Sequence, residues 1–194
     1  TVAGALVNVA APLCGKTSVN LNYTVGKSGL EAAVRLADLR TIVTSRVFVE
    51  KAKLELPEGP SIVWLEDIAR TISTGQKLVA SLLALCSPAW LIERACGQDD
   101  PLTMDDLATI IFSSGSTGEP KGVMLTHFNI DANAQGANQV LHLYRDERVL
   151  GILPFFHSFG YLVFWLATFK NVRIVLHPSQ LYATATGDLV FRHR

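Results

Sequence analysis

The sequence has few cysteines and no excess of charge of either sign. Its three cysteines, Cys14, Cys86 and Cys96, are odd in number and show no paired spacing, so we expect buried free thiols in a reducing compartment. Lys+Arg and Asp+Glu balance at 17 each. This balance predicts neither a basic surface for nucleic acid nor an acidic, solvating tail.

Long apolar runs are also missing. Residues 1–13 are apolar but lack the basic start of a secretory signal. Residues 78–92 are interrupted by Ser81, Ser87 and Pro88, and they fall short of the ~20 apolar residues that span a membrane. A buried or interfacial helix is the favoured interpretation of this second segment, and contact with a membrane surface is the alternative.

An initiating methionine is absent as well. Thr1 lies within an apolar run, and residues 191–194 lie within a predicted helix, so we expect a chain cut at both ends. With 49% hydrophobic residues, the 194-residue chain still has enough apolar surface for a substantial core.

The pattern along the chain alternates between strands and helices. Strands are predicted for residues 18–22, 41–44, 61–65, 107–113, 123–125, 148–153 and 172–176. Helices are predicted for residues 2–13, 29–39 with Ser28 as cap, 47–54, 69–95 with a break near Ser87-Pro88, 127–143 with Thr126 as cap, 159–169 and 183–194. This order predicts an α/β fold with a mostly parallel sheet and helices on both faces.

Residues 97–106 form an acidic linker between two sub-regions. Its four carboxylates have no His or Cys beside them, which favours a solvated connector over a metal site.

The most informative segment follows the apolar strand at residues 107–112. Its sequence is Ser113-Ser114-Gly115-Ser116-Thr117-Gly118-Glu119-Pro120-Lys121-Gly122. Backbone N–H groups, four hydroxyls and one ammonium are the groups that bind a polyphosphate. Ligands in parallel sheets bind beyond the carboxyl ends of strands, and this loop follows such an end. The spacing is not that of a P-loop, and an unspecialised Gly/Ser surface turn is the alternative.

Two blocks resemble the AMP-binding, adenylate-forming superfamily, which includes acyl-CoA synthetases, luciferases and the adenylation domains of peptide synthetases. Residues 110–121 match its signature position by position, and residues 153–160, Leu-Pro-Phe-Phe-His-Ser-Phe-Gly, resemble its next core motif. The resemblance covers essentially the whole chain, which would be part of the large N-terminal domain of a family member. It implies a two-step ligase. A carboxylic acid and ATP form an acyl adenylate, and the thiol of coenzyme A or of the phosphopantetheine on an acyl carrier protein then takes the acyl group.

The resemblance also implies roles for particular residues. Backbone N–H groups of residues 114–118 would bind the β- and γ-phosphates, with added hydroxyl donors from Ser113, Ser114, Ser116 and Thr117. Lys121 would supply a point charge, and its alternative role is to anchor the loop by a salt bridge. Ser113 or Thr117 is a candidate ligand of Mg²⁺, which takes few protein ligands.

His157 is the predicted catalytic residue. In this family the corresponding side chain lies between the nucleotide and acyl pockets, where it would gate or orient the carboxylate. The alternative is a packed histidine in an ordinary aromatic core with Phe155, Phe156 and Phe159.

The acid is predicted to lack an α-amino group. Amino-acid-activating relatives place an Asp where this chain has Ser158, and a neutral hydroxyl cannot pair with an ammonium. A fatty or aryl acid is therefore favoured. Residues 19–23 and 42–46 resemble the synthetase part of bacterial acyl-ACP synthetase/2-acylglycerophosphoethanolamine acyltransferase proteins. That subgroup implies a cytoplasmic protein, with peripheral contact at the inner face of the cytoplasmic membrane.

The motifs for adenine, ribose and the adenylation lysine, and the small C-terminal domain, are absent from these residues. We therefore expect that this chain alone makes no acyl adenylate, and that its open sheet edge pairs two copies into a homodimer. The alternatives are a nucleotide-binding module without catalysis and a luciferase-like oxygenase of the same superfamily.

Overall fold

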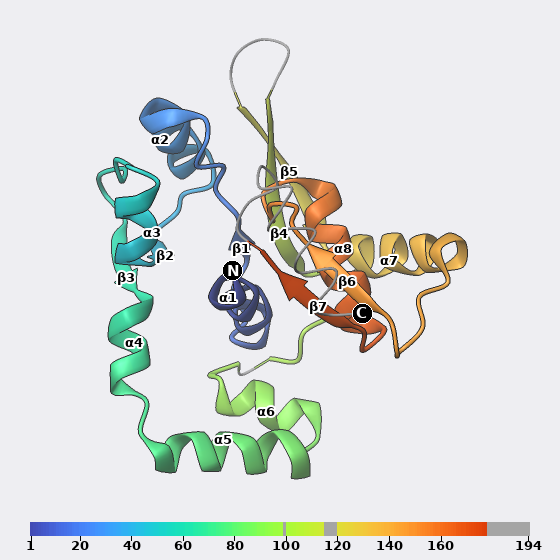
Figure 1. Cartoon of the computed structure of the whole chain (residues 1–194). Coiled ribbons are helices and arrows are strands. Elements are labelled where there is room, and N and C mark those ends of the chain that lie inside the picture. The colour runs from blue at the N-terminus through green and yellow to red at the C-terminus, as the bar shows by residue number, and fades with distance from the viewer. Residues whose placement is uncertain (99, 115–119, 178–194) are drawn as a thin grey trace.

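A three-stranded sheet lies at the centre of the chain. The computed structural model describes residues 1–98, 100–114 and 120–177. Strand β4 (Leu107–Ser114) lies between β1 (Ser18–Val19), with which it is parallel, and β5 (Pro120–Thr126), with which it is antiparallel. In Figure 1, β4 and β5 run together as a long ribbon that extends beyond the helices around them.

The buried core joins this sheet to two helices. Helix α7 (His127–Leu141) follows β5 directly and packs against α8 (Ser158–Phe169). Helix α8 connects β6 (Arg148–Gly151) with β7 (Arg173–Leu176), a parallel pair. Buried residues of β4, α7 and α8 form one cluster: Ala108, Ile111, Ile130 and Tyr161, with Leu125, Phe155 and Trp165 packed against it.

Strand β4 is fixed to β1 by polar contacts as well. The Thr109 side chain is fully buried, and its hydroxyl donates to the Ser18 carbonyl oxygen at 2.7 Å. The Thr17 hydroxyl donates to the Leu107 carbonyl oxygen at 3.1 Å. Helix α1 (Val2–Leu13) lies next to β1, where Asn8 and Asn20 exchange side-chain hydrogen bonds of 2.8 and 3.0 Å.

The elements between residues 26 and 71 lie on the other side of α1 from the β4–β5 ribbon (Figure 1). Strands β2 (Thr41–Thr44) and β3 (Ser61–Trp64) form a parallel pair in the company of α2 (Gly26–Leu36), α3 (Arg46–Lys51) and α4 (Leu65–Thr71). Helices α5 (Thr74–Cys86) and α6 (Ala89–Ala95) then lead back toward the centre, and neither helix has a buried residue.

The predicted α/β class is confirmed, since three of the four strand pairings among the described residues are parallel. Thr126 caps α7 as predicted, through a capping box with Asn129. The prediction that Ser28 caps a helix is wrong: α2 begins at Gly26, so Ser28 lies inside it. The predicted helix over residues 69–95 is three helices, because a capping box of Ser73 with Gln76 starts a new one there.

The predicted burial of the cysteines is also wrong. All three thiols are free, but Cys86 and Cys96 are exposed and Cys14 is half-buried. Cys86 is the last residue of α5, and Cys96 directly follows α6. Both cysteines are exposed because these two helices pack against little of the protein. The predicted helix over residues 183–194 lies outside the described residues. The described part of residues 97–106 forms neither helix nor strand, and the division into two sub-regions stays a prediction.

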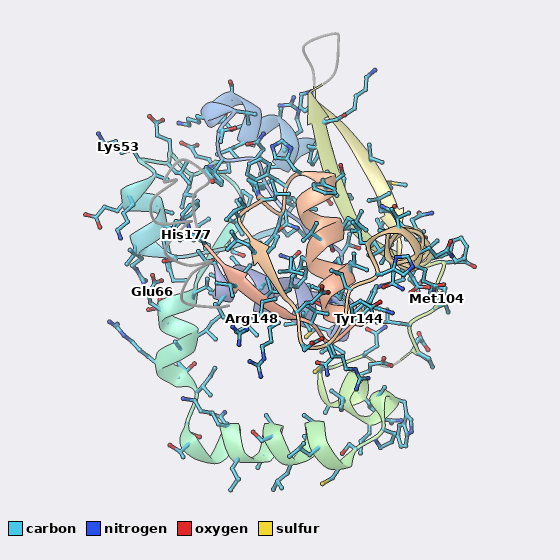
Figure 2. All side chains as sticks on the ribbon, turned by 45° about the vertical axis from the view of Figure 1, so that its right-hand side comes forward. Lys53, Glu66, Met104, Tyr144, Arg148 and His177 are labelled. Atoms are coloured by element: carbon cyan, nitrogen blue, oxygen red, sulfur yellow. The ribbon has the colours of Figure 1, made fainter. Side chains whose placement is uncertain are left out.

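A carboxylate connects α3 with α4. Ser45 caps α3, and its hydroxyl also donates to a carboxylate oxygen of Glu66 in α4 at 2.7 Å. This bond, and backbone N–H groups including those of Arg46 and Val47, lower the pKa of Glu66 to about 2. Beside it, Arg46 donates two hydrogen bonds to Asp67, at 2.9 and 2.7 Å. Glu66 is labelled in Figure 2, near the start of α4.

We therefore predict that Glu66→Gln destabilises the protein in a pH-dependent way. The pKa of Glu66 is lower in the folded state, so its contribution is present above the ordinary value of 4.5 and is lost as the pH falls toward about 2. Urea unfolding at pH 7 is expected to show a lower midpoint for the variant, and the difference between the two midpoints is expected to shrink steadily as the pH falls from 4.5 toward about 2. A constant difference across this range would contradict the assignment. Glu58→Gln, an exposed carboxylate in the turn before β3, is the matched control.

Candidate functional site

The hairpin of β4 and β5 places two of the predicted phosphate-binding residues opposite each other. Ser113 pairs with Lys121, and Ser114 pairs with Pro120. The Ser113 hydroxyl lies 3.5 Å from the Lys121 carbonyl oxygen, and both residues are exposed. The Ser113 hydroxyl and the Lys121 ammonium are thus exposed at the same end of the hairpin, next to the connection between β4 and β5.

Lys121 takes part in none of the salt bridges between described residues, which join Lys27 with Glu55, Arg40 with Asp38 and Arg46 with Asp67. Within the described part of the chain, the alternative role of a loop-anchoring ion pair therefore has no partner. The other predicted phosphate-binding residues, Gly115, Ser116, Thr117 and Gly118, lie outside the described residues.

Gly122 has a structural role that the sequence analysis missed. It pairs with Phe112, and a Cβ atom at this position would lie 3.0 Å from the Ile110 side chain and 3.3 Å from the Phe112 ring. Any side chain there would have to displace a neighbouring strand residue. The glycine thus lets the large apolar side chains of β4 lie against β5 next to Lys121.

His157 lies at the start of α8, as its N-cap residue, and its side chain is exposed. Its ring contacts the buried Phe156 ring, with centroids 4.7 Å apart. Phe156 in turn meets the Tyr23 ring edge-on at 5.3 Å. The alternative of an ordinary aromatic core holds for Phe156 but not for Phe159, which is 60% exposed. The His157 imidazole is therefore exposed to solvent, while the Phe156 ring that it contacts is buried.

The turn before His157 is held by a close backbone approach. A Cβ atom on Gly160 would lie 2.3 Å from the Pro154 carbonyl oxygen, and the His157 N–H donates to that same oxygen at 3.1 Å. The first turn of α8 thus lies directly on the backbone of the segment that carries His157. Only glycine fits this contact, and the sequence analysis did not identify it.

No hydrogen bond or ring contact within the described residues joins His157 to Ser113 or Lys121. The two groups belong to one packed unit, however, because Tyr161 of α8 lies in the same core cluster as Ile111 of β4. The Tyr161 hydroxyl also lies 3.4 Å from the Ser18 hydroxyl of β1. The structure therefore fixes His157 and the hairpin to a common core.

A cavity of about 340 Å³ lies at the other end of β4. Its lining includes Lys16, Thr103, Asp106 and His127. The Asp106 carboxylate accepts hydrogen bonds from the Thr103 backbone and hydroxyl at 2.6 and 3.0 Å, and these bonds lower the pKa of Asp106. Its carboxylate thus stabilises the turn before β4.

Two properties of the described residues bear on metals and membranes. In residues 1–98, 100–114 and 120–177, no three His, Cys, Asp or Glu side chains are grouped so that they could hold a metal ion. No helix in those ranges is both long and apolar enough to cross a membrane.

The sequence profile of the family described as AMP-binding enzyme matches residues 2–193. The chain belongs to this family, as its two motifs predicted. Over 179 residues it is 30% identical to 2-succinylbenzoate–CoA ligase of Bacillus cereus (strain Q1). This alignment covers 86% of this chain and 36% of that protein. Over 172 residues it is 29% identical to probable 4-coumarate–CoA ligase 3 of Dictyostelium discoideum, covering 83% of this chain and 31% of that one.

Human long-chain-fatty-acid–CoA ligase 6 is 27% identical over 175 residues, covering 79% of this chain and 24% of that protein. The chain thus spans between 24% and 36% of the length of these three curated relatives. All three names are those of acid–CoA ligases.

Solved structures show the same fold. O-succinylbenzoate coenzyme A synthetase (MenE) from Bacillus subtilis, in complex with AMP, aligns with a TM-score of 0.76 at 19% identity and covers 100% of this chain and 44% of that chain. The same enzyme in complex with ATP and magnesium ion aligns with a TM-score of 0.74 at 18% identity, covering 100% and 36%. At these identities the likeness is one of fold.

The contact at Gly160 generates a prediction about stability. Gly160→Ala is expected to destabilise the protein by about 1–3 kcal/mol, because the added methyl group meets backbone atoms that cannot rotate away. Gly136→Ala is the matched control, since Gly136 lies on an exposed face of α7 and an added Cβ atom would meet no heavy atom within 4 Å. That change is expected to stabilise the protein by about 0.5–1 kcal/mol. Urea midpoints measure both, and equal midpoints for the two variants would contradict the close approach.

Proposed function

We propose that this chain binds the polyphosphate of ATP in an enzyme that activates a carboxylic acid as an acyl adenylate and passes the acyl group to a thiol. The observation that carries the proposal is the hairpin end with Ser113 and Lys121 opposite each other, in a chain that belongs to the AMP-binding enzyme family. A fixed ammonium beside hydroxyls and backbone N–H groups neutralises developing negative charge without reorganising.

The residues at the hairpin end fit ATP with Mg²⁺. The Ser113 hydroxyl and the Lys121 ammonium are exposed, and no described salt bridge competes for the lysine. Mg²⁺, when bound, neutralises phosphate charge, keeps several waters and takes few protein ligands. Ser113 is our candidate ligand among the described residues. We assign the remaining phosphate contacts to Ser114, Gly115, Ser116, Thr117 and Gly118, as the family resemblance implies.

We assign the orientation of the carboxylate to His157. Its imidazole is exposed at the N-terminus of α8, where unpaired backbone N–H groups favour an anion. Next to it, Ser158 is exposed and uncharged. This favours a fatty or aryl acid over an amino acid, because an α-ammonium group would find no carboxylate there.

Acid-dependent exchange of pyrophosphate into ATP tests this proposal. The full-length enzyme that contains this chain is expected to catalyse exchange with one or more fatty or aryl acids, and not with amino acids. Formation of a thioester with coenzyme A or with an acyl carrier protein identifies the acceptor. Nucleotide binding without exchange for any acid would instead favour a binding module. The 194-residue chain alone is expected to give no exchange, because it spans about a third of its relatives.

Lys121→Ala tests the phosphate contact in the full-length enzyme. Loss of a charge-assisted contact is expected to lower kcat/KM for ATP roughly 10- to 100-fold. Lys51→Ala, which removes an exposed lysine from α3, is the matched control and is expected to leave it unchanged. An unchanged kcat/KM in the Lys121 variant would remove the polyphosphate assignment.

We also propose that α5 makes peripheral contact with an anionic membrane surface. Four apolar side chains of α5 are more than half exposed, and successive residues lie about 100° apart on a helix, so they share an arc of about 120°. These are Leu78, Val79, Leu82 and Leu85, at 62, 57, 53 and 82% exposure. Between Asp67 and Glu93 the only charged residues are Arg70 and Lys77. An apolar arc with nearby cations suits an interface of anionic lipid.

Pairing of two copies through the open edge of the sheet stays a prediction.

Flotation with vesicles of anionic phospholipid measures this contact. The full-length protein is expected to float with the vesicles, and Leu82→Asp is expected to lower the bound fraction at least several-fold by placing a carboxylate in the apolar arc. Ala84→Asp adds the same charge on the opposite side of α5 and is expected to have a smaller effect. Equal effects of the two substitutions would contradict a role for the apolar arc.

A further inference from the structure

Two helices of this chain end in the same short sequence. Helix α1 is followed directly by Cys14-Gly15, and α6 is followed directly by Cys96-Gly97. In both cases the cysteine is the C-cap residue, and the glycine that follows has a positive φ, +61° at Gly15 and +88° at Gly97. These are left-handed conformations in which glycine is favoured, so each helix stops sharply after its cysteine.

The hydrogen bonds at the two ends correspond as well. The N–H of Lys16 donates to the Ala11 carbonyl oxygen at 2.8 Å. The N–H of Gln98 donates to the Glu93 carbonyl oxygen at 3.0 Å. Both bonds span five residues and close the last turn, as in a Schellman motif. The backbone at each cysteine is therefore fixed by its own helix end.

The two helix ends also meet in space. A Cβ atom on Gly15 would coincide with the Gln98 side chain, whose amide oxygen would lie 1.6 Å away. The side chain two residues after Cys96 thus lies directly on the residue after Cys14. Pro12, Gly15 and Gln98 also line the same cavity at the base of β4. In Figure 1, α6 lies just below α1.

Cys14 and Cys96 both adjoin this contact, one residue before Gly15 and two residues before Gln98. Burial raises the pKa of the Cys14 thiol, and the neighbouring Cys96 thiol raises it further. Cys14 is half-buried and Cys96 is exposed. An oxidant in solution therefore reaches Cys96 first, and Cys14 is placed to react with the product.

We propose that Cys14 and Cys96 form a reversible intramolecular disulfide on exposure to a peroxide, joining the C-terminal ends of α1 and α6. The Cys96 sulfur attacks a peroxide oxygen, the O–O bond breaks, and Cys96 becomes a sulfenic acid while one water is released. The Cys14 sulfur then displaces the hydroxyl from Cys96, and its own proton leaves with that hydroxyl as a second water. The two thiols lose two electrons in total, the peroxide gains them, and a small thiol reverses the reaction by exchange.

The bond would close a loop that contains every element from β1 to α6. This loop includes the β2–β3 pair and the exposed α5, and the end of α6 lies beside the end of α1. A covalent link at its base restricts the unfolded chain strongly, because the two cysteines are far apart in sequence. Oxidation is therefore expected to raise the stability of the protein without a change at the β4–β5 hairpin end.

Oxidation followed by peptide mass spectrometry tests the proposal. The full-length protein is treated with equimolar hydrogen peroxide, and remaining thiols are blocked before digestion. We expect a linked pair of peptides containing Cys14 and Cys96, lighter by roughly 2 Da than their reduced sum. We also expect a rise in Tm of roughly 5–10 °C that dithiothreitol reverses.

Three single substitutions provide the controls. Cys14→Ser and Cys96→Ser are each expected to abolish both the linked peptide and the rise in Tm. Cys86→Ser, which removes the exposed cysteine at the end of α5, is expected to leave both unchanged. Two outcomes would overturn the proposal: crosslinks mainly between molecules through Cys86, or oxidation of Cys96 to sulfinic acid with no link to Cys14.

Discussion

The position of β4 between two different partners is the constraint on which the rest of the structure depends. On one side β4 pairs in parallel with β1, where the buried Thr109 hydroxyl donates to the Ser18 carbonyl oxygen. On the other side it pairs in antiparallel fashion with β5, so that Ser113 faces Lys121. Its buried face meets α7 and α8 in one apolar cluster. A hydroxyl and a cation are thereby placed opposite each other at the end of this strand, and it is on this arrangement that our proposal of polyphosphate binding rests.

Sequence patterns identified most of the elements because their physical causes are local. Thr126 begins α7 because its hydroxyl accepts from the Asn129 backbone, three residues along the chain. The break near Ser87-Pro88 is a local effect of proline, whose ring and missing N–H disfavour continuation of the preceding helix. Ser28 failed as a cap because the preceding turn, with Gly26 at a positive φ, already begins the helix. Gly26 and Ser28 thus offered two competing helix starts two residues apart, and the helix begins at the first.

Contacts between distant segments were beyond the same reasoning. Gly160 and Gly122 are glycines because another part of the backbone or a strand neighbour occupies the space of a side chain. The adjacency of Cys14 and Cys96 likewise depends on how α1 and α6 meet. For the candidate site, the sequence placed Ser113, Lys121 and His157 next to the right elements, but it did not indicate that Lys121 lies in a strand that pairs back onto β4. Antiparallel pairing across a short connection has no signature in residue composition alone.

The direct junction of β5 with α7 has a mechanical consequence. Thr126 is both the last residue of β5 and the cap of α7, so strand and helix meet without a hinge residue. Helix α7 packs on α8, and the first turn of α8 rests on the backbone that carries His157. The β4–β5 ribbon and the segment that carries His157 are therefore joined by one continuous series of packed elements.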